Sequence, residues 1–159
     1  MTERLSLPDF GKYFRTNSRS PIDFVCRDAP NLLHDIVFLR SYIHDASFDV
    51  SRIRLGTKIL RIPMQRDRWE RYKTSRKLES IEAILVISPV LALKWKSIPK
   101  ARGKSCPGKF YIRDVYLGES YWDSSDVAEI VLSSFGKKPS QLRIVVREPF
   151  SIRMTDVGG

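Results

Sequence analysis

The sequence predicts an α+β domain in which one principal helix, at about residues 29–43, packs on a mainly antiparallel curled sheet or β-sandwich of about seven to eight strands. A helical spacing of apolar residues occurs near the N-terminus. From Asp49 onward the apolar period is 2, and turn residues recur after roughly 8–20 positions. Strands and helices do not alternate as in βαβ units, so we expect neighbouring strands to run antiparallel.

Residues 1–22 show no sustained period and contain several turn-forming residues. We therefore expect an N-terminal arm, followed by a single domain over residues 23–159. Asp28 can cap a helix whose first turn accepts Pro30. The apolar face of this helix consists of Leu32, Ile36, Leu39 and Ile43, widened by Leu33 and Val37, with His34 and Ser41 opposite.

The remainder is mostly strand. The expected strands cover residues 50–55, 58–64, 81–87, 90–95, 110–117, 120–122, 127–135 and 141–147, with a further strand after Pro149. Gly56-Thr57 suits a two-residue type II′ hairpin loop, which would place Arg52 and Arg54 on one face. Ser88-Pro89 predicts a bulge or bend between two apolar stretches.

The charge is unevenly distributed along the chain. The 159 residues include 28 Lys plus Arg against 18 Asp plus Glu, a net charge of +10. Residues 49–117 carry 17 basic and 6 acidic side chains, whereas the segments on either side are nearly neutral. The whole excess therefore lies in the middle of the chain, where anionic partners would be expected to bind.

The basic segment also contains aromatic residues, as a surface that contacts phosphates and stacks on bases would. The alternative is a solvated face, with lysines that protect sheet edges. The candidate anion-binding or partner-binding residues are Arg52, Arg54, Arg66, Arg68, Trp69, Arg71, Lys73, Lys94, Lys96, Lys100, Arg102 and Lys104.

Each catalytic pattern that we tested fails. Gly103-Lys104-Ser105 resembles part of a phosphate-binding loop, but Ile98 stands where that loop needs its first Gly. Pro107 occupies the last Gly position of a nucleophile elbow. Cys106 lies near lysines that could lower its pKa, but a nucleophile also needs a positioned base.

The two histidines occur as His34-Asp35 and His44-Asp45. Ten helical residues turn through about 1,000°, so the imidazoles do not share a face, as a two-histidine metal site would require. A third ligand would have to come from a distant acid such as Asp114 or Asp123. We therefore expect no bound metal and no cofactor.

These observations favour a non-catalytic binding module with a basic surface for an acidic protein or a nucleic-acid backbone. The alternatives are a small metal-dependent hydrolase that uses His and Asp residues, and a structural domain without a ligand. We expect no membrane span and no secretory signal, hence a cytoplasmic protein. Cys26 and Cys106 are expected to be free thiols.

Overall fold

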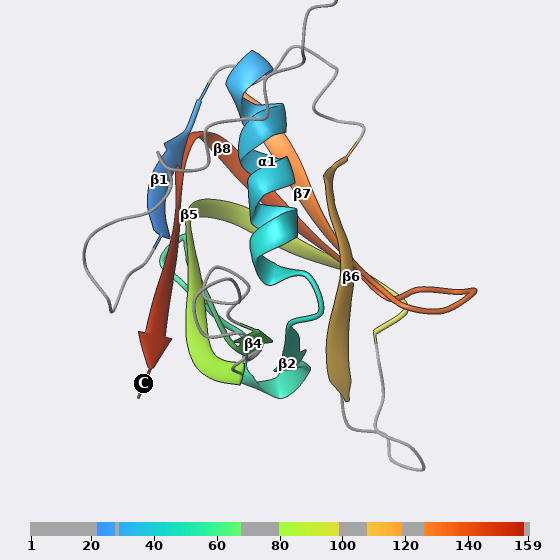
Figure 1. Ribbon diagram of the computed structural model, residues 1–159. Helices are drawn as coiled ribbons and strands as arrows, with labels where there is room; N and C mark the ends of the chain where they lie inside the picture. The colour runs from blue at the N-terminus through green and yellow to red at the C-terminus, as the bar shows by residue number, and fades with distance from the viewer. Residues whose placement is uncertain (1–21, 28, 68–79, 99–107, 119–125, 158–159) are drawn as a thin grey trace, which may run out of the picture.

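A computed structural model describes residues 22–27, 29–67, 80–98, 108–118 and 126–157. It contains one α-helix, one 3₁₀ helix and eight strands within those ranges (Figure 1). Their bounds are β1 (Ile22–Cys26), α1 (Ala29–Ile43), β2 (Ser47–Asp49), η2 (Val50–Arg52), β3 (Arg54–Gly56), β4 (Ile59–Asp67), β5 (Ser80–Lys96), β6 (Lys109–Leu117), β7 (Val127–Ser134) and β8 (Gln141–Val157).

Six of the strands close into an antiparallel barrel in the order β8-β5-β4-β2-β6-β7, and β7 returns to pair with β8. β1 and β3 are added outside this ring, on β8 and β4 respectively. The prediction of antiparallel strands is confirmed, but the curled sheet or sandwich is wrong. Local periodicity identifies strands, whereas closure depends on β2 joining β4 to β6, a contact between distant parts of the chain.

Two strands of 17 residues, β5 and β8, shape the barrel. The first half of β5 lies between β4 and the end of β8, and its second half pairs with the start of β8. Register shifts follow Ser88, as the Ser88-Pro89 pair predicts. On β8, the pairing with β7 begins at Gln141 and extends to Arg147, and the pairing with β1 starts at Phe150. Pro149 thus marks the change of partner, at a position where a missing N–H donor is tolerated.

The helix α1 packs across the barrel between β1 and β6 (Figure 1). Leu32, Ile36, Leu39 and Ile43 are buried as predicted, and His34 and Ser41 are exposed. Leu33 and Val37, which we expected to widen the apolar face, are instead 40% and 49% exposed. Phe38 and Tyr42 take their place, with ring centroids 5.6 Å apart.

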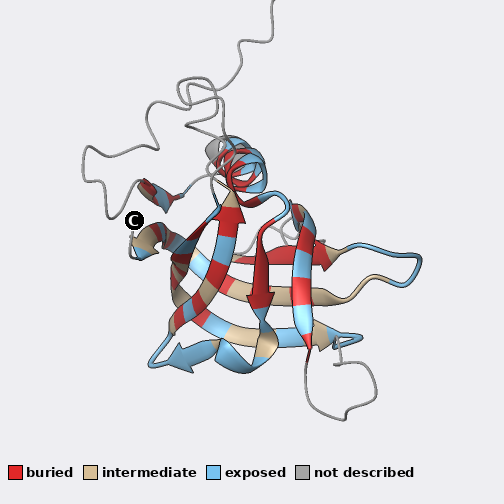
Figure 2. Cartoon of the chain, turned by 60° about the horizontal axis from the view of Figure 1, so that its bottom comes forward, coloured by how far each residue is buried: buried red, intermediate tan, exposed pale blue. Residues whose placement is uncertain are grey.

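The barrel interior is filled by inward-facing apolar side chains, and buried and exposed residues alternate along the strands (Figure 2). Phe48 and Phe110 stack at 4.9 Å, and Trp95 meets Phe110 edge-on at 6.1 Å. Val50, the first residue of η2, and Ile53, which follows its last residue, are partly buried and pack against this core. Of the strand expected over residues 50–55, residues 50–52 form the 3₁₀ helix η2 instead, and residues 54–55 belong to β3.

Candidate functional site

The most cationic described segment is formed by the end of η2 and the hairpin that follows it. We call Arg52, Arg54, Lys58 and Arg61 the cationic hairpin, and all four residues are exposed. Arg54 on β3 and Arg61 on β4 are direct cross-strand partners. The Cβ atoms of such partners lie about 5 Å apart on the same face. Arg54 turns its Nη1 to the carbonyl oxygens of Ser51 and Ile53, at 2.8 and 3.0 Å.

The turn of this hairpin differs from the prediction by one residue. Gly56 pairs with Ile59, so Thr57 and Lys58 form the loop. Both have positive φ, 33° and 64°, which is the sign that a type I′ turn requires and that Thr and Lys seldom adopt. The strained turn holds Lys58 at the tip of the hairpin.

Asp49 anchors the base of the cationic hairpin. Its carboxylate accepts from the Ser51 hydroxyl at 2.8 Å and from the Ser51 N–H at 3.0 Å, which caps η2. These two hydrogen bonds, followed by the charges of Arg52 and Lys109, lower the pKa of Asp49 below its usual value. Asp49 therefore stays ionised at neutral pH beside two cations.

Five arginines elsewhere in the barrel are ion-paired with carboxylates. Within the described ranges, the ion pairs with arginine are Arg40 with Asp114, Arg66 with Asp156, Arg143 with Glu129, Arg147 with Asp126, and Arg153 with Asp23. Three of these arginines lie on β8. No member of the cationic hairpin is ion-paired with a carboxylate in the part of the chain that the structure describes.

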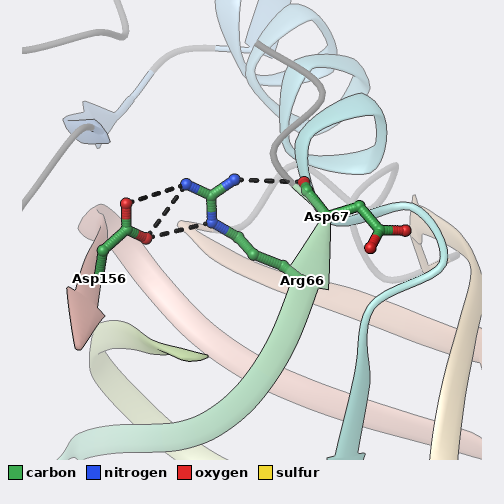
Figure 3. A network of polar contacts seen from close by, with 3 residues as sticks. All are labelled: Arg66, Asp67 and Asp156. Atoms are coloured by element: carbon green, nitrogen blue, oxygen red, sulfur yellow. Dashed lines mark hydrogen bonds and ion pairs between the residues drawn. The ribbon is translucent and has the colours of Figure 1, made fainter. Parts of the chain in front are cut away.

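Arg66, one of the sequence-predicted site residues, lies in the interior at the end of β4 (Figure 3). Its guanidinium donates to both carboxylate oxygens of Asp156, at 3.1 to 3.3 Å, and to the carbonyl oxygen of Asp67 at 3.4 Å. It also lies 4.3 Å from the centroid of the Tyr42 ring. Arg66 therefore joins β4, β8 and α1 and is not part of the exposed surface.

Lys94 and Lys96 are exposed near the end of β5, opposite Arg143 and Gln141 of β8. They are separate from the cationic hairpin in the sheet, since β4 pairs only with the first half of β5. The structure thus brings Arg52 and Arg54 together but leaves the two lysines on another part of the barrel. The remaining predicted site residues, Arg68, Trp69, Arg71, Lys73, Lys100, Arg102 and Lys104, lie outside the described residues, as does Cys106.

A second surface was missed at the level of sequence. Lys109, Tyr111 and Arg113 alternate with buried residues along β6 and are all exposed. The Lys109 Nζ lies 5.7 Å from the Tyr111 ring centroid, and the Arg113 Cζ lies 5.8 Å from that of Phe135. We call these four residues the β6 stripe. The alternation of Phe110 and Ile112 with Lys109, Tyr111 and Arg113 is the sequence pattern that could have identified this exposed face.

A depression of about 280 Å³ is lined by residues of both surfaces. Arg52 of the cationic hairpin and Lys109 of the β6 stripe both line it, together with Pro63 and Ile84. The carboxylates of Asp49 and Glu82 line it as well. The depression therefore connects the cationic hairpin to the β6 stripe and carries charges of both signs.

His44 lines a second depression, of about 320 Å³, near the far end of the β6 stripe. Arg40, Arg113 and Asp114 also line it, and Asp114 is held by Arg40 at 3.1 Å. The His44 Nδ1 lies 3.1 Å from a carboxylate oxygen of Asp45. Across the described ranges, no three His, Cys, Asp or Glu side chains gather as a metal ion would need.

Comparisons with known proteins returned no matching family model, no matching curated protein and no matching solved structure. In the described part of the chain, no helix combines the length and apolar character needed to cross a membrane. Cys26, the thiol within that part, is buried.

Proposed function

We propose that this protein is a binding module that holds a polyanionic macromolecule, the phosphate backbone of a nucleic acid, on the cationic hairpin. One observation carries the proposal. Arg54 and Arg61 stand directly opposite each other, next to Arg52 and Lys58, without an ion-pairing carboxylate among the described residues. Like charges in that position destabilise a strand pair.

A bound phosphate backbone would offset this repulsion, because each phosphate oxygen accepts from one or more guanidinium groups. The contrast with β8 supports the idea. There Arg147 and Arg153 each have a carboxylate partner at 3.6 and 3.1 Å, so their charges are already compensated. The cationic hairpin therefore offers an external anion a group of charges that no ion-paired carboxylate of the described residues compensates.

The hairpin also has a shape suited to the task. Its tip is a two-residue turn, and its base is fixed by the capped η2 and by core contacts of Val50 and Ile53. Phosphate contacts position a ligand without reading its sequence. We therefore expect binding that depends on charge and salt more than on nucleotide sequence. An acidic protein is the other partner with this chemistry.

The test compares two variants with the same change in charge. R52Q/R61Q removes two cations of the hairpin, and R27Q/R147Q removes two exposed cations near Pro149, where β8 changes partner. The probes are a fluorescein-labelled 15-nucleotide oligomer and labelled polyglutamate, each followed by fluorescence anisotropy at 50 mM salt.

We expect R52Q/R61Q to weaken oligonucleotide binding at least tenfold and R27Q/R147Q to change it by less than about threefold. Binding of polyglutamate but not of the oligomer would replace the nucleic acid by an acidic protein. Equal losses in the two variants, or no binding to either probe, would contradict the proposal.

A further inference from the structure

We infer that the β6 stripe stacks unpaired bases, so that the nucleic acid held by this domain is single-stranded. The inference rests on the proposed function, since the cationic hairpin would hold the backbone of the same strand. Its own basis is different. It depends on two exposed aromatic rings, Tyr111 and Phe135, each 52% exposed and each next to a cation.

The four residues follow one another along the barrel surface. Lys109, Tyr111 and Arg113 are two positions apart on β6, and each step of two residues advances about 7 Å along a strand. Ile112 pairs with Ser134, which places Phe135 beside Arg113 at the start of the β7–β8 turn. Cation and ring therefore alternate along an extended line.

This alternation matches the chemistry of a single strand, which presents a charged phosphate and a flat base at every nucleotide. Exposed aromatic rings bind bases irrespective of their identity, because every base has a π-face. In a duplex the base faces are covered by stacking, and the rings would have nothing to contact. Two exposed rings that are not part of the apolar core therefore favour a single strand over a duplex.

The stripe is also continuous with the cationic hairpin. The depression of about 280 Å³ is lined by both Arg52 and Lys109, so one extended ligand can touch both surfaces. At the other end of the stripe, the depression of about 320 Å³ is lined by both Arg113 and Phe135, next to the hydroxyl-bearing residues Ser133 and Ser134. The β6 stripe therefore runs from the depression of about 280 Å³ to the depression of about 320 Å³.

Acidic side chains also lie near the β6 stripe. Asp49 is the cross-strand partner of Lys109, and Asp114 lies beside Arg113 in sequence. Asp114 is engaged by Arg40 and by the Val115 N–H, at 3.1 and 2.9 Å. Asp49 and Glu82 are the acids that a phosphate would meet in the depression of about 280 Å³, where Arg52 and Lys109 balance their charge.

The experiment separates bases from phosphates. The probes are a 15-nucleotide oligothymidylate, an abasic oligomer of the same length and charge, and a 15-base-pair duplex, all measured with the intact protein. We expect the oligothymidylate to bind roughly 5- to 150-fold more tightly than the abasic oligomer, as stacking of one base would produce. The duplex should bind no better than the abasic probe.

Variants locate the effect. Y111L and F135L should each lower the preference for bases, whereas Y111F keeps a ring and should retain it. Y116L is the matched control, because Tyr116 lies on the same strand but its hydroxyl is bonded to Gln141 at 2.9 Å. Thermal unfolding of each variant shows that the fold is kept, as expected for side chains that are half exposed.

Equal affinity for the oligothymidylate and the abasic oligomer would overturn the inference and leave the proposed function standing. A loss in Y111L that is equal for both probes would overturn it as well, since the ring would then act without bases. If neither probe binds at low salt, the proposed function itself fails.

Discussion

The buried ion pair between Arg66 and Asp156 allows a quantitative test of the fold. The substitution R66M removes the guanidinium but keeps an unbranched apolar stem of similar length. It leaves the Asp156 carboxylate, whose side chain is only 7% exposed, without its bidentate partner. It also removes the contact with the Tyr42 ring at 4.3 Å.

The expected cost follows from this geometry. Breaking a buried pair by removing one partner costs about 3–5 kcal/mol, because the remaining buried charge loses its ion-pair partner. A domain of this kind has a total stability of about 5–15 kcal/mol, so R66M should lose a large part of it. D156L should cost a similar amount. The double variant R66M/D156L should lose less than about 2 kcal/mol, since apolar side chains then fill the space.

Urea unfolding followed by tryptophan fluorescence measures all four proteins. The expected result is strong coupling, with the double variant far more stable than the sum of the single losses predicts. Addition of salt should change the stability of the wild-type protein little, because a buried pair is weakly screened. Losses below about 1 kcal/mol in both single variants would indicate an exposed pair and refute the buried arrangement.

Three further outcomes follow from the described structure. The substitution K58G relieves the positive φ at the hairpin tip and should raise the free energy of unfolding by about 1 kcal/mol while weakening oligonucleotide binding; a less stable protein in urea would contradict the strained turn. The substitution F110A removes the ring that contacts Phe48 and Trp95 and should cost about 3–5 kcal/mol, with a shift in tryptophan emission; a loss under 1 kcal/mol would show that the ring is not in the core. Because the pKa of Asp49 is lowered by folding, its contribution to stability is present above its unfolded pKa and is lost as the pH falls through the folded value. D49N keeps a capping residue and should remove that part of the acid dependence of the urea midpoint, while raising oligonucleotide affinity through the lost negative charge; an unchanged pH profile together with unchanged affinity would refute both roles.

The sequence predicted those features that depend on neighbouring residues. The helix at Ala29–Ile43 and most of the strands follow from apolar spacing that a single element contains. The closed barrel does not, because it requires β2, of three residues, to bridge β4 and β6. A strand so short has almost no periodicity. The fusion of two expected stretches into β5 was also hidden, because Pro89 interrupts the pattern without ending the strand.

The same reasoning explains why Arg66 and Arg61, on one strand, differ in exposure. On β4, Arg66 is in phase with the buried Leu60, Ile62 and Met64, whereas Arg61 has the opposite phase. A strict period of 2 would have assigned Arg66 to the interior. The compensating acid could not have been found, because Asp156 is 90 residues away in the sequence. Charge counted along the chain treats both arginines alike, and only the fold separates them.

The β6 stripe illustrates the opposite case. Its strand was predicted, and Lys109, Tyr111 and Arg113 were available as outward positions, but Phe135 joins them only through the pairing of Ile112 with Ser134. Trp95, in contrast, is an aromatic residue of the basic segment that packs against the core. Aromatic content near basic residues therefore did not distinguish stacking rings from core rings.

The salt dependence of oligonucleotide binding tests the central claim most directly, namely that the unpaired cations of the hairpin contact phosphates. The affinity of a 15-nucleotide single strand is measured between 50 and 200 mM salt for the wild-type protein, R52Q/R61Q and R27Q/R147Q. If the four cations of the hairpin and the two of the β6 stripe each contact one phosphate, log K should fall with log salt with a slope of about −4. R52Q/R61Q should reduce the steepness by about a third, and R27Q/R147Q should leave it unchanged. A slope near zero, or one that both variants reduce equally, would contradict the account.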